Sequence, residues 1–234
     1  MNKLKTTILA AFAIAAMSTN AFAGQFGIGV SGSIAAVGAS GTETDADNTG
    51  TEVSNREGTA SNNVALGSIF AEYTFEGLAG MTFGVDVIPA TADVNSKSLS
   101  RTDTAVGLGT SGSSTGSAKY TAQAEISDHY TYYAELPLGG SGAYVMAGYT
   151  EMDIATKEKS TNAQTGSYPD TKVDGLKYGI GFKGSLGGGS MFYKIQGSHT
   201  EYDTLTVKSD SVKPNSISAD LDVTAATIAV GFNF

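Results

Sequence analysis

The sequence predicts an all-β protein, an eight-stranded antiparallel up-and-down transmembrane β-barrel. Three observations predict it. The chain opens with a secretory signal, its last nine residues alternate strictly between bulky apolar and small or polar side chains, and the connections between predicted strands alternate between short and long. At the edge of a soluble sheet, such a strand would expose unpaired backbone N–H and C=O groups that favour aggregation. A closed barrel instead pairs the last strand with the first.

Residues 1–23 form the predicted signal peptide. Lys3 and Lys5 give the positive segment, residues 8–17 are apolar, and Ala21 and Ala23 fit the small-x-small cleavage rule. The alternative, a retained membrane anchor, is disfavoured because the apolar run is too short to span a bilayer. Residues 24–234 are expected to form one outer-membrane β-barrel domain.

Composition excludes several classes of function. The chain has 14 Lys and Arg against 23 Asp and Glu, so it lacks the basic footprint of a nucleic-acid binder. It has no cysteine, which excludes disulfides, thiol nucleophiles and cysteine metal sites. We expect no cofactor and no nucleic-acid partner. Gly is abundant at 30 residues, as suits tight turns and a crowded barrel interior.

Eight segments alternate with the period of a β-strand, over residues 25–36, 64–75, 81–91, 119–136, 143–154, 172–186, 191–207 and 217–234. In the sixth, for example, Leu176, Tyr178 and Ile180 share one face. The fourth is longer than the roughly 10 residues that cross a bilayer at a tilt, so it should project beyond the membrane.

Two strands have an uncertain facing. In the fifth, we expect Tyr144, Met146 and Met152 to face outward, because this places Glu151 and Asp153 inside. In the eighth, Leu221 and Val223 oppose the later outward set, which a bulge or the end of the lipid zone near Thr224 would explain.

The predicted connections fall into two classes. Short turns follow strands two, four and six, whereas long polar stretches cover residues 37–62, 93–117, 155–170 and 208–215. This sorting is typical of outer-membrane barrels, which have short periplasmic turns and long external loops. The alternative is a ten-stranded barrel with another hairpin within 93–117.

Aromatic residues gather near the short-turn ends of the predicted strands, one on each strand. A ring of aromatics at one interface is expected of a membrane barrel, where amphipathic rings lie at the headgroup level. The predicted girdle consists of Phe26, Phe75, Phe83, Tyr132, Tyr144, Phe182, Tyr193 and Phe234.

The final strand, with Ile228, Val230, Phe232 and Phe234 on one face, resembles the C-terminal assembly signal of bacterial outer-membrane barrels. Together with the signal peptide and the strand pattern, it makes the chain similar to the small outer-membrane β-barrel superfamily, which includes the opacity-type proteins. The resemblance implies location in the outer membrane of a Gram-negative bacterium and a monomeric state. It also implies contact with outer-membrane lipids and lipopolysaccharide, periplasmic chaperones and the barrel-assembly machinery.

Eight charged side chains are predicted to face the lumen, with acids on strands two to five and lysines on strands six and seven. They are Glu72, Asp86, Glu125, Glu135, Glu151, Lys177, Lys183 and Lys194. A lone buried charge costs several kcal/mol, so these groups should pair across the lumen. A polar plug is favoured over a gated ion path, because a general pore needs about twice as many strands.

No catalytic or metal site is expected. Ser198 and His199 are neighbours on one strand and point to opposite faces, so they cannot form a nucleophile and base pair. His129 lies on another strand and is interpreted as a polar group of the rim or lumen. Residues 45–52 partly resemble a calcium loop, but the closing Glu52 comes too early and no helices flank it.

The sequence therefore predicts a non-enzymatic outer-membrane barrel with long surface loops, whose role is surface interaction, adhesion or envelope integrity. A narrow, porin-like channel for ions or small molecules is the alternative. A lipid-A-modifying barrel enzyme is a third and weaker hypothesis. No extracellular ligand can be named from the residues.

Overall fold

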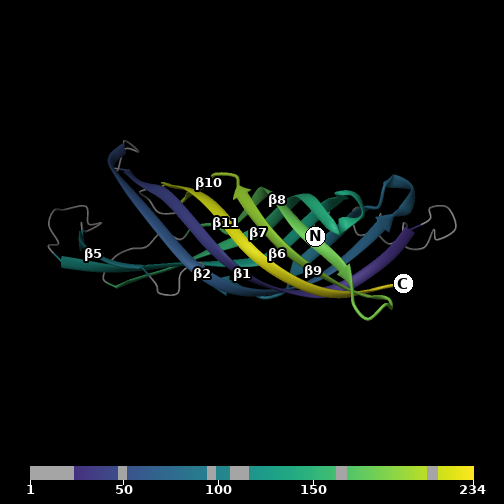
Figure 1. Cartoon of the computed structure of the whole chain (residues 1–234). Coiled ribbons are helices and arrows are strands. Elements are labelled where there is room, and N and C mark those ends of the chain that lie inside the picture. Colours follow the sequence, from purple (N-terminus) through teal and green to yellow (C-terminus); the bar gives the residue numbers. More distant parts are fainter. Residues whose placement is uncertain (1–23, 47–51, 94–98, 106–115, 162–167, 210–215) are drawn as a thin grey trace.

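The computed structural model of the chain describes residues 24–46, 52–93, 99–105, 116–161, 168–209 and 216–234, and most of them lie in strands (Figure 1). The predicted signal peptide, with its cleavage site at Ala21 and Ala23, lies outside these ranges. Within them, no helix is long and apolar enough to cross a membrane.

The strands tilt around a single barrel and are followed here in chain order. They are β1 (Gly24–Ala46), β2 (Glu52–Phe75), β3 (Met81–Ile88), β4 (Ala92–Asp93), β5 (Leu99–Ala105), β6 (Gly116–Pro137), β7 (Ala143–Thr161), β8 (Thr171–Ser185), β9 (Met191–Tyr202), β10 (Leu205–Lys208) and β11 (Ser216–Asn233). Two short 3-10 turns, Glu76–Leu78 and Gly139–Ser141, join β2 to β3 and β6 to β7.

The sheet closes on itself, because β1 pairs with β2 on one side and with β11 on the other. The eleven strands occupy eight positions in the wall. Strands β3, β4 and β5 follow one another along the same edge of β6, and β9 and β10 do so along β11. Neighbours are antiparallel throughout, so the predicted eight-stranded up-and-down barrel is confirmed, and residues 99–105 continue the third wall position without adding a hairpin.

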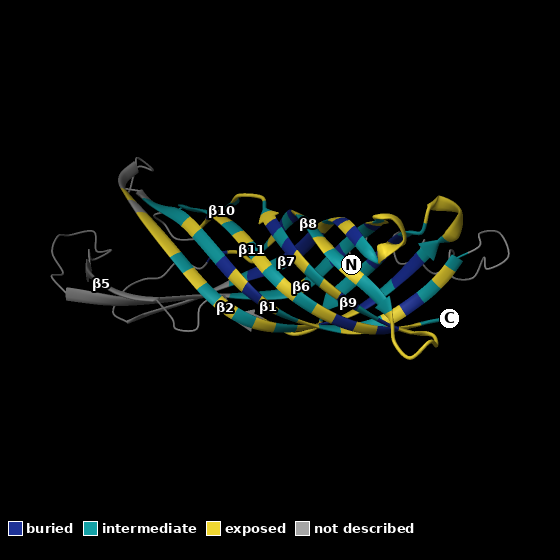
Figure 2. Ribbon diagram, in the orientation of Figure 1, coloured by how far each residue is buried: buried dark blue, intermediate teal, exposed yellow. Residues whose placement is uncertain are grey.

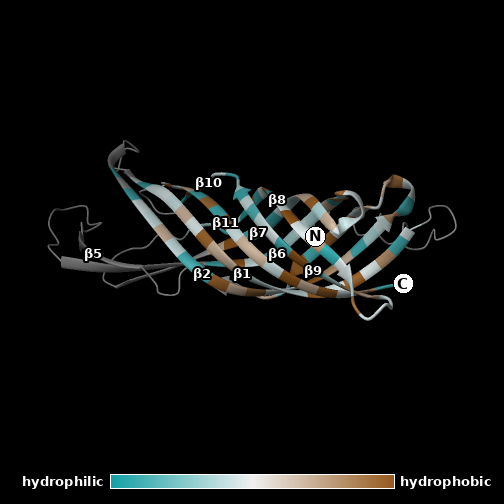
Figure 3. Cartoon of the chain, viewed as in Figure 1, coloured by the Kyte–Doolittle hydropathy of each residue, from teal (hydrophilic) through white to brown (hydrophobic). Residues whose placement is uncertain are grey.

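Along the described parts of the strands, more exposed residues alternate with less exposed ones, as the banded ribbon shows (Figure 2), so successive residues face the outside and the inside of the wall in turn. On β8, Ile180 is 69% exposed, whereas Lys177 and Lys183 face inward. Bands of apolar residues recur along the strands (Figure 3), and exposed ones such as Ile180 lie on the outside of the barrel. The predicted common face of Leu176, Tyr178 and Ile180 is confirmed, and it is the outer one.

The predicted facing of the fifth strand is wrong. Val145 pairs with Ile180 and Tyr149 pairs with Leu176, and these outward partners fix the odd-numbered residues of β7 on the outside. Tyr144, Met146 and Met152 therefore point inward and are buried. The apolar character of β7 on both faces made its facing ambiguous, and pairing with β8 decides it.

A β-bulge changes the facing of β6 part-way along its length. The register with β7 shifts between Ser127 and Tyr130, and Asp128 has a left-handed φ of 48°. One extra residue reverses the alternation, so Ile126 packs inside with Met152. The regular alternation predicted over residues 119–136 therefore breaks at this point.

Strand β11 has no bulge, contrary to one of the two explanations offered for its changing pattern. Its pairing with β1 is continuous from Asn233 to Ser216. Leu221 and Val223 face the interior, while the outer face becomes polar beyond Thr224. The apolar face thus moves from the outside of the barrel to the inside along a single regular strand.

Much of what was predicted as long loops is strand. β1 and β2 stay paired as far as Ala46 and Glu52, and β7 continues to Thr161. These extensions consist mainly of polar and small residues, so their sequence carries no apolar period. Their backbone groups are satisfied by pairing with neighbouring strands, which needs no apolar side chain.

The short-turn end of the barrel carries aromatic contacts between neighbouring strands. Ring centroids of Phe26 and Phe234 lie 6.4 Å apart, and the Phe234 N–H donates to the Phe26 carbonyl at 2.8 Å. Phe75 and Phe83 make an edge contact at 5.7 Å. Tyr144 was wrongly placed in this girdle, since it faces the interior.

Inward aromatic rings lie against glycines of the adjacent strand. A Cβ atom at Gly181 would come within 2.3 Å of the Tyr144 ring, and one at Gly84 within 2.2 Å of the Tyr133 ring. These glycines therefore provide the space that lets two tyrosines lie within a narrow interior. Gly197, on the outer face of β9, has nothing within 4 Å of such an atom.

We expect Gly181→Ala and Gly84→Ala to destabilise the barrel by about 1–3 kcal/mol, because the tyrosine rings must move. Gly197→Ala is the matched control and should be close to neutral. Denaturant titration of protein folded into lipid vesicles measures the difference. Equal effects at all three positions would contradict the packing described here.

Candidate functional site

The interior holds two distinct regions. A charged network lies toward the short-turn end, and a mainly apolar chamber lies toward the end with the long extensions. Both are built from inward-facing residues of several strands, so neither is visible as a local sequence motif. The candidate functional site is this filled lumen.

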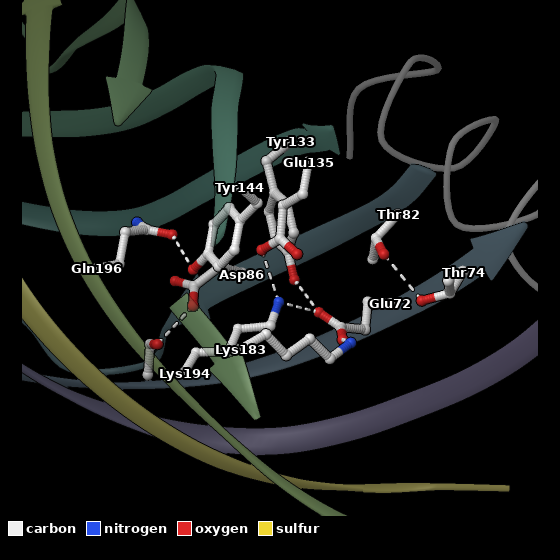
Figure 4. Close-up of polar contacts among 11 residues, drawn as sticks. Glu72, Thr74, Thr82, Asp86, Tyr133, Glu135, Tyr144, Lys183, Lys194 and Gln196 are labelled. Atoms are coloured by element: carbon white, nitrogen blue, oxygen red, sulfur yellow. Dashed lines mark hydrogen bonds and ion pairs between the residues drawn. The ribbon is translucent and has the colours of Figure 1, made fainter. Parts of the chain in front are cut away.

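Lys194 of β9 is the centre of the charged network (Figure 4). Its ammonium donates to Glu72 of β2 and, at 2.6 Å, to Glu135 of β6. Glu72 is 1% exposed and Lys194 is 5% exposed. Since β9 is separated from β2 by β11 and β1, the contact spans the lumen and does not follow the wall.

Two further groups complete the coordination of Glu72. Lys183 donates to its other oxygen at 2.7 Å, and the Tyr133 hydroxyl donates at 2.9 Å. The Lys183 ammonium also lies 4.4 Å from the centre of the Phe192 ring, where the negative face of the ring attracts it. Two carboxylates thus meet two ammonium groups, and the cluster is formally neutral.

Neutrality decides whether such a cluster can be buried. Breaking a buried ion pair by removing one partner costs about 3–5 kcal/mol, because the remaining charge is desolvated without compensation. Here every carboxylate has an ammonium partner, and hydrogen bonds between Tyr144 and Gln196 (3.0 Å) and between Thr74 and Thr82 (2.8 Å) add neutral links. The arrangement fills the narrow interior with satisfied polar groups.

Asp86 forms a second polar link beside the network. It accepts a hydrogen bond from Ser68 at 2.6 Å, and Ser68 in turn contacts Ser31 at 2.6 Å across β1 and β2. The ammonium groups of Lys177 and Lys194 attract its carboxylate electrostatically. Asp86 therefore lies between the charged network and the chamber.

The structure brings together six of the eight predicted lumen charges and separates the other two. Glu72, Asp86, Glu135, Lys177, Lys183 and Lys194 face the interior. Glu151 lies on the outer face of β7, beside Tyr132 and Tyr149. Glu125 lies on the face opposite the inward Ile126. Both corrections follow from the strand facings reported above.

Sequence analysis missed the neutral partners of the network. Tyr133 lies two residues from Glu135, which was predicted to face the lumen, but its contact with Glu72 depends on which strands face each other across the barrel. Tyr144 was assigned to the outside, so its contact with Gln196 could not be found. Pairing to the neighbouring strand is the signal that would have corrected it.

The chamber was also not predicted, because its apolar residues come from several strands. They include Met146 and Met152 of β7 and Ile126 of β6, which were expected to face outward or whose facing changes at the bulge. The chamber has a cavity volume of about 140 Å³. Met152, Ile154 and Val173 form a buried cluster, against which Ile126, Tyr202, Leu205 and Leu221 pack. Of these, Met152, Ile126 and Tyr202 line the chamber, together with the apolar residues Ala35, Val37, Val64, Leu66, Phe70, Ile88, Ala90, Met146, Val223, Ala225 and Ala229.

The histidines do not form a nucleophile and base arrangement. Ser198 faces the chamber, whereas His199 faces outward, where it contacts Thr224 at 2.8 Å. The His129 Nε2 atom contacts Tyr202 at 3.0 Å and Thr150 at 3.2 Å. Among the residues that the structure describes, no three acidic or histidine side chains are grouped as metal ligands. The partial calcium loop at 45–52 lies largely outside those residues.

Comparison with known proteins gives structural similarity only. No protein-family model and no curated protein sequence matches the chain. The outer-membrane protein OprG from Pseudomonas aeruginosa is similar, with 14% identity, 91% of this chain and 97% of that chain covered, and a TM-score of 0.39. A FadL homologue from the same organism has 8% identity, coverage of 89% and 90%, and a TM-score of 0.38.

The Yersinia pestis attachment invasion locus protein Ail, in complex with the heparin analogue sucrose octasulfate, is also similar. The two sequences are 12% identical, the matched region covers 88% of this chain and 99% of the Ail chain, and the TM-score is 0.31. The eight-stranded architecture stands on the strand pairing of this chain.

Removing the central ammonium should destabilise the barrel strongly. We expect Lys194→Met to cost about 3–5 kcal/mol in unfolding from lipid vesicles, because it leaves Glu135 without a cation. Lys172→Met is the matched control, since Lys172 pairs with Asp153 at the surface and should cost at most about 1 kcal/mol. Adding Glu135→Gln to Lys194→Met should recover part of the loss. Equal costs for the two lysine variants would contradict a stabilising network.

Proposed function

We propose that this chain is an integral protein of a bacterial outer membrane. The apolar outer surface of the barrel carries the proposal: Ile34 is 71% exposed and Ile180 is 69% exposed, and both belong to a belt around the wall. Other members of the belt are Ile28, Val30, Ile69, Phe83, Leu176, Phe182, Ile195, Ile228, Val230 and Phe232. In water such a belt would be costly, whereas in a bilayer it meets the lipid chains.

The charged network supports a barrel without an open ion path. An eight-stranded barrel is just wide enough for side chains to fill. Lys194, Glu72 and Glu135 are bound to one another across this width, with Tyr133 and Tyr144 packed beside them. An ion crossing here would have to break a neutral, hydrogen-bonded cluster.

The strand extensions support a role at the cell surface. About 10 residues of tilted strand cross a bilayer, whereas β1 has 23 residues and β2 has 24. Belt residues of β1, such as Ile28 and Val30, lie in the half of the strand nearer the short turns, and the long ends of β1 and β2 project on the other side (Figure 1). These extensions carry polar side chains such as the Ser40 and Thr42 hydroxyls, which fits adhesion or envelope interaction. Lipopolysaccharide, periplasmic chaperones and the assembly machinery remain proposed partners, and the proposed protein is a monomer without enzymatic activity.

Topology can be tested by chemical labelling, because the chain has no cysteine of its own. We expect Gly58→Cys, on the extension of β2, to react with a membrane-impermeant maleimide on whole cells. Gly77→Cys, in the short turn after β2, should react only after the outer membrane is permeabilised. Both glycines have open space around a Cβ atom, so neither change should disturb folding. Labelling of Gly77→Cys on intact cells would overturn the orientation.

Conduction is tested in planar lipid bilayers. We expect the wild-type barrel to show no steady single-channel openings, because the network occludes its lumen. A Tyr133→Ala/Tyr144→Ala variant removes two inward rings and should raise the open probability, which shows that the assay can detect a pore. Steady openings of the wild type, reduced by Lys194→Gln, would instead favour a narrow channel.

A further inference from the structure

We propose that the chamber above the charged network binds a compact apolar monocarboxylate. This goes beyond the proposed surface role, because it assigns a ligand site to the interior of the barrel. The apolar part of the ligand would lie against β1, β7 and β11, and its carboxylate would lie between Lys177 and Ser198. Two polar side chains, Lys177 and Ser198, and the apolar wall beside them make up this site.

The Ser198 hydroxyl is the first of these two polar groups, and it is buried. Its side chain lines the chamber at 7% exposure, and its Oγ atom has no hydrogen-bond partner among the described residues. Buried hydroxyl groups in proteins are nearly always hydrogen-bonded, since leaving one unpaired costs about 1–3 kcal/mol. An unpaired hydroxyl facing a cavity is accounted for if a ligand supplies the acceptor.

Lys177 provides a cation at the same place. Its side chain lines the chamber. Within the described part of the chain, its ammonium group makes no hydrogen bond and no ion pair at contact distance. The Asp86 carboxylate attracts it electrostatically from a longer distance. Lys177 pairs with Thr200 in the sheet, and Ser198 lies two residues from Thr200 on the same face. Such diagonal neighbours lie about 7–8 Å apart, a spacing that one carboxylate can bridge.

The wall beside these two groups is apolar. In the continuous pairing of β9, β11 and β1, Ser198 lies next to Ala225 and then Ala35, and Thr200 lies next to Val223 and then Val37. On the other side of Ser198, the β8 residue Gly179 pairs with Ser198 and also with Met146 of β7, so Met146 lies one strand further along the wall. An anion-binding pair therefore adjoins a surface that favours hydrocarbon.

Cavity size limits the ligand class. The volume of about 140 Å³ is close to the roughly 150 Å³ of an engineered apolar cavity that binds benzene. A single aromatic ring or a short branched chain therefore fits, whereas a long acyl chain does not fit within this volume. Benzoate combines one ring with one carboxylate and is the probe of choice.

The test uses the full barrel in lipid nanodiscs, with its methionine methyl groups labelled for NMR. Met146 and Met152 line the chamber, whereas Met81 and Met191 lie on the outer face and report partitioning of the probe into lipid. We expect benzoate to shift the Met146 signal saturably and to leave Met81 and Met191 unchanged. Benzyl alcohol, of similar size but neutral, should bind more weakly.

Variants separate the proposed contacts from general effects. Lys177→Met should weaken benzoate binding about tenfold, as expected for loss of one charge-assisted hydrogen bond. Lys172→Met, an exposed lysine on the same strand, should leave it unchanged. Ser198→Ala should also weaken binding without destabilising the empty barrel, because it removes an unpaired polar group. Heat-modifiable migration on gels verifies that each variant is folded.

Two results would overturn the proposal. The first is the absence of a saturable Met146 shift, or an equal shift of the outward methionines, which would show that benzoate only partitions into lipid. The second is equal benzoate affinity of the Lys177→Met and Lys172→Met variants, which would show that no carboxylate binds at Lys177.

Discussion

Closure of the backbone hydrogen-bond ladder is the constraint on which the rest of this structure depends. Within a bilayer no water is available to an unpaired N–H or C=O group, so the first and last strands must pair. β1 meets β11 over nearly its whole length, and no free edge remains along that part of the wall. A closed wall of eight positions has a narrow interior, and this in turn obliges the inward charges to neutralise one another.

The sequence was informative wherever one face of a strand had to meet lipid. Ile180 lies between Gly179 and Gly181, so only its own side of the strand could be the apolar one. In the structure, that side faces outward. Where both faces were apolar, as around Met146 on β7, the pattern did not decide and pairing with β8 did. Where both faces were polar, as in residues 37–46, the pattern gave no signal, although the backbone continues as strand. Amphipathic alternation therefore predicts the membrane zone of a barrel better than its full height.

The interior was predictable in composition but not in contacts. The alternation of side chains between the two faces of each strand was enough to place Glu72 and Lys194 inside, because acidic and basic side chains seldom face lipid. Which lysine contacts which carboxylate depends on how far the strands are staggered around the closed wall. The residue pattern of a single strand does not determine this stagger. The bulge at Asp128 shows the same limit, since one left-handed residue moved Ile126 inside and Glu125 outside.

The long, uninterrupted register of β1 has a mechanical consequence. Its pairs with β11 run from Gly27 and Asn233 to Thr44 and Ser216, and its pairs with β2 reach equally far. A pull on the outer tip of these strands would act parallel to them and would load the many cross-strand hydrogen bonds together, in shear. Peeling the bonds apart one at a time would require a sideways force. In the proposed membrane setting, a barrel built in this way would transmit tension from its projecting strand ends directly into the rest of the wall.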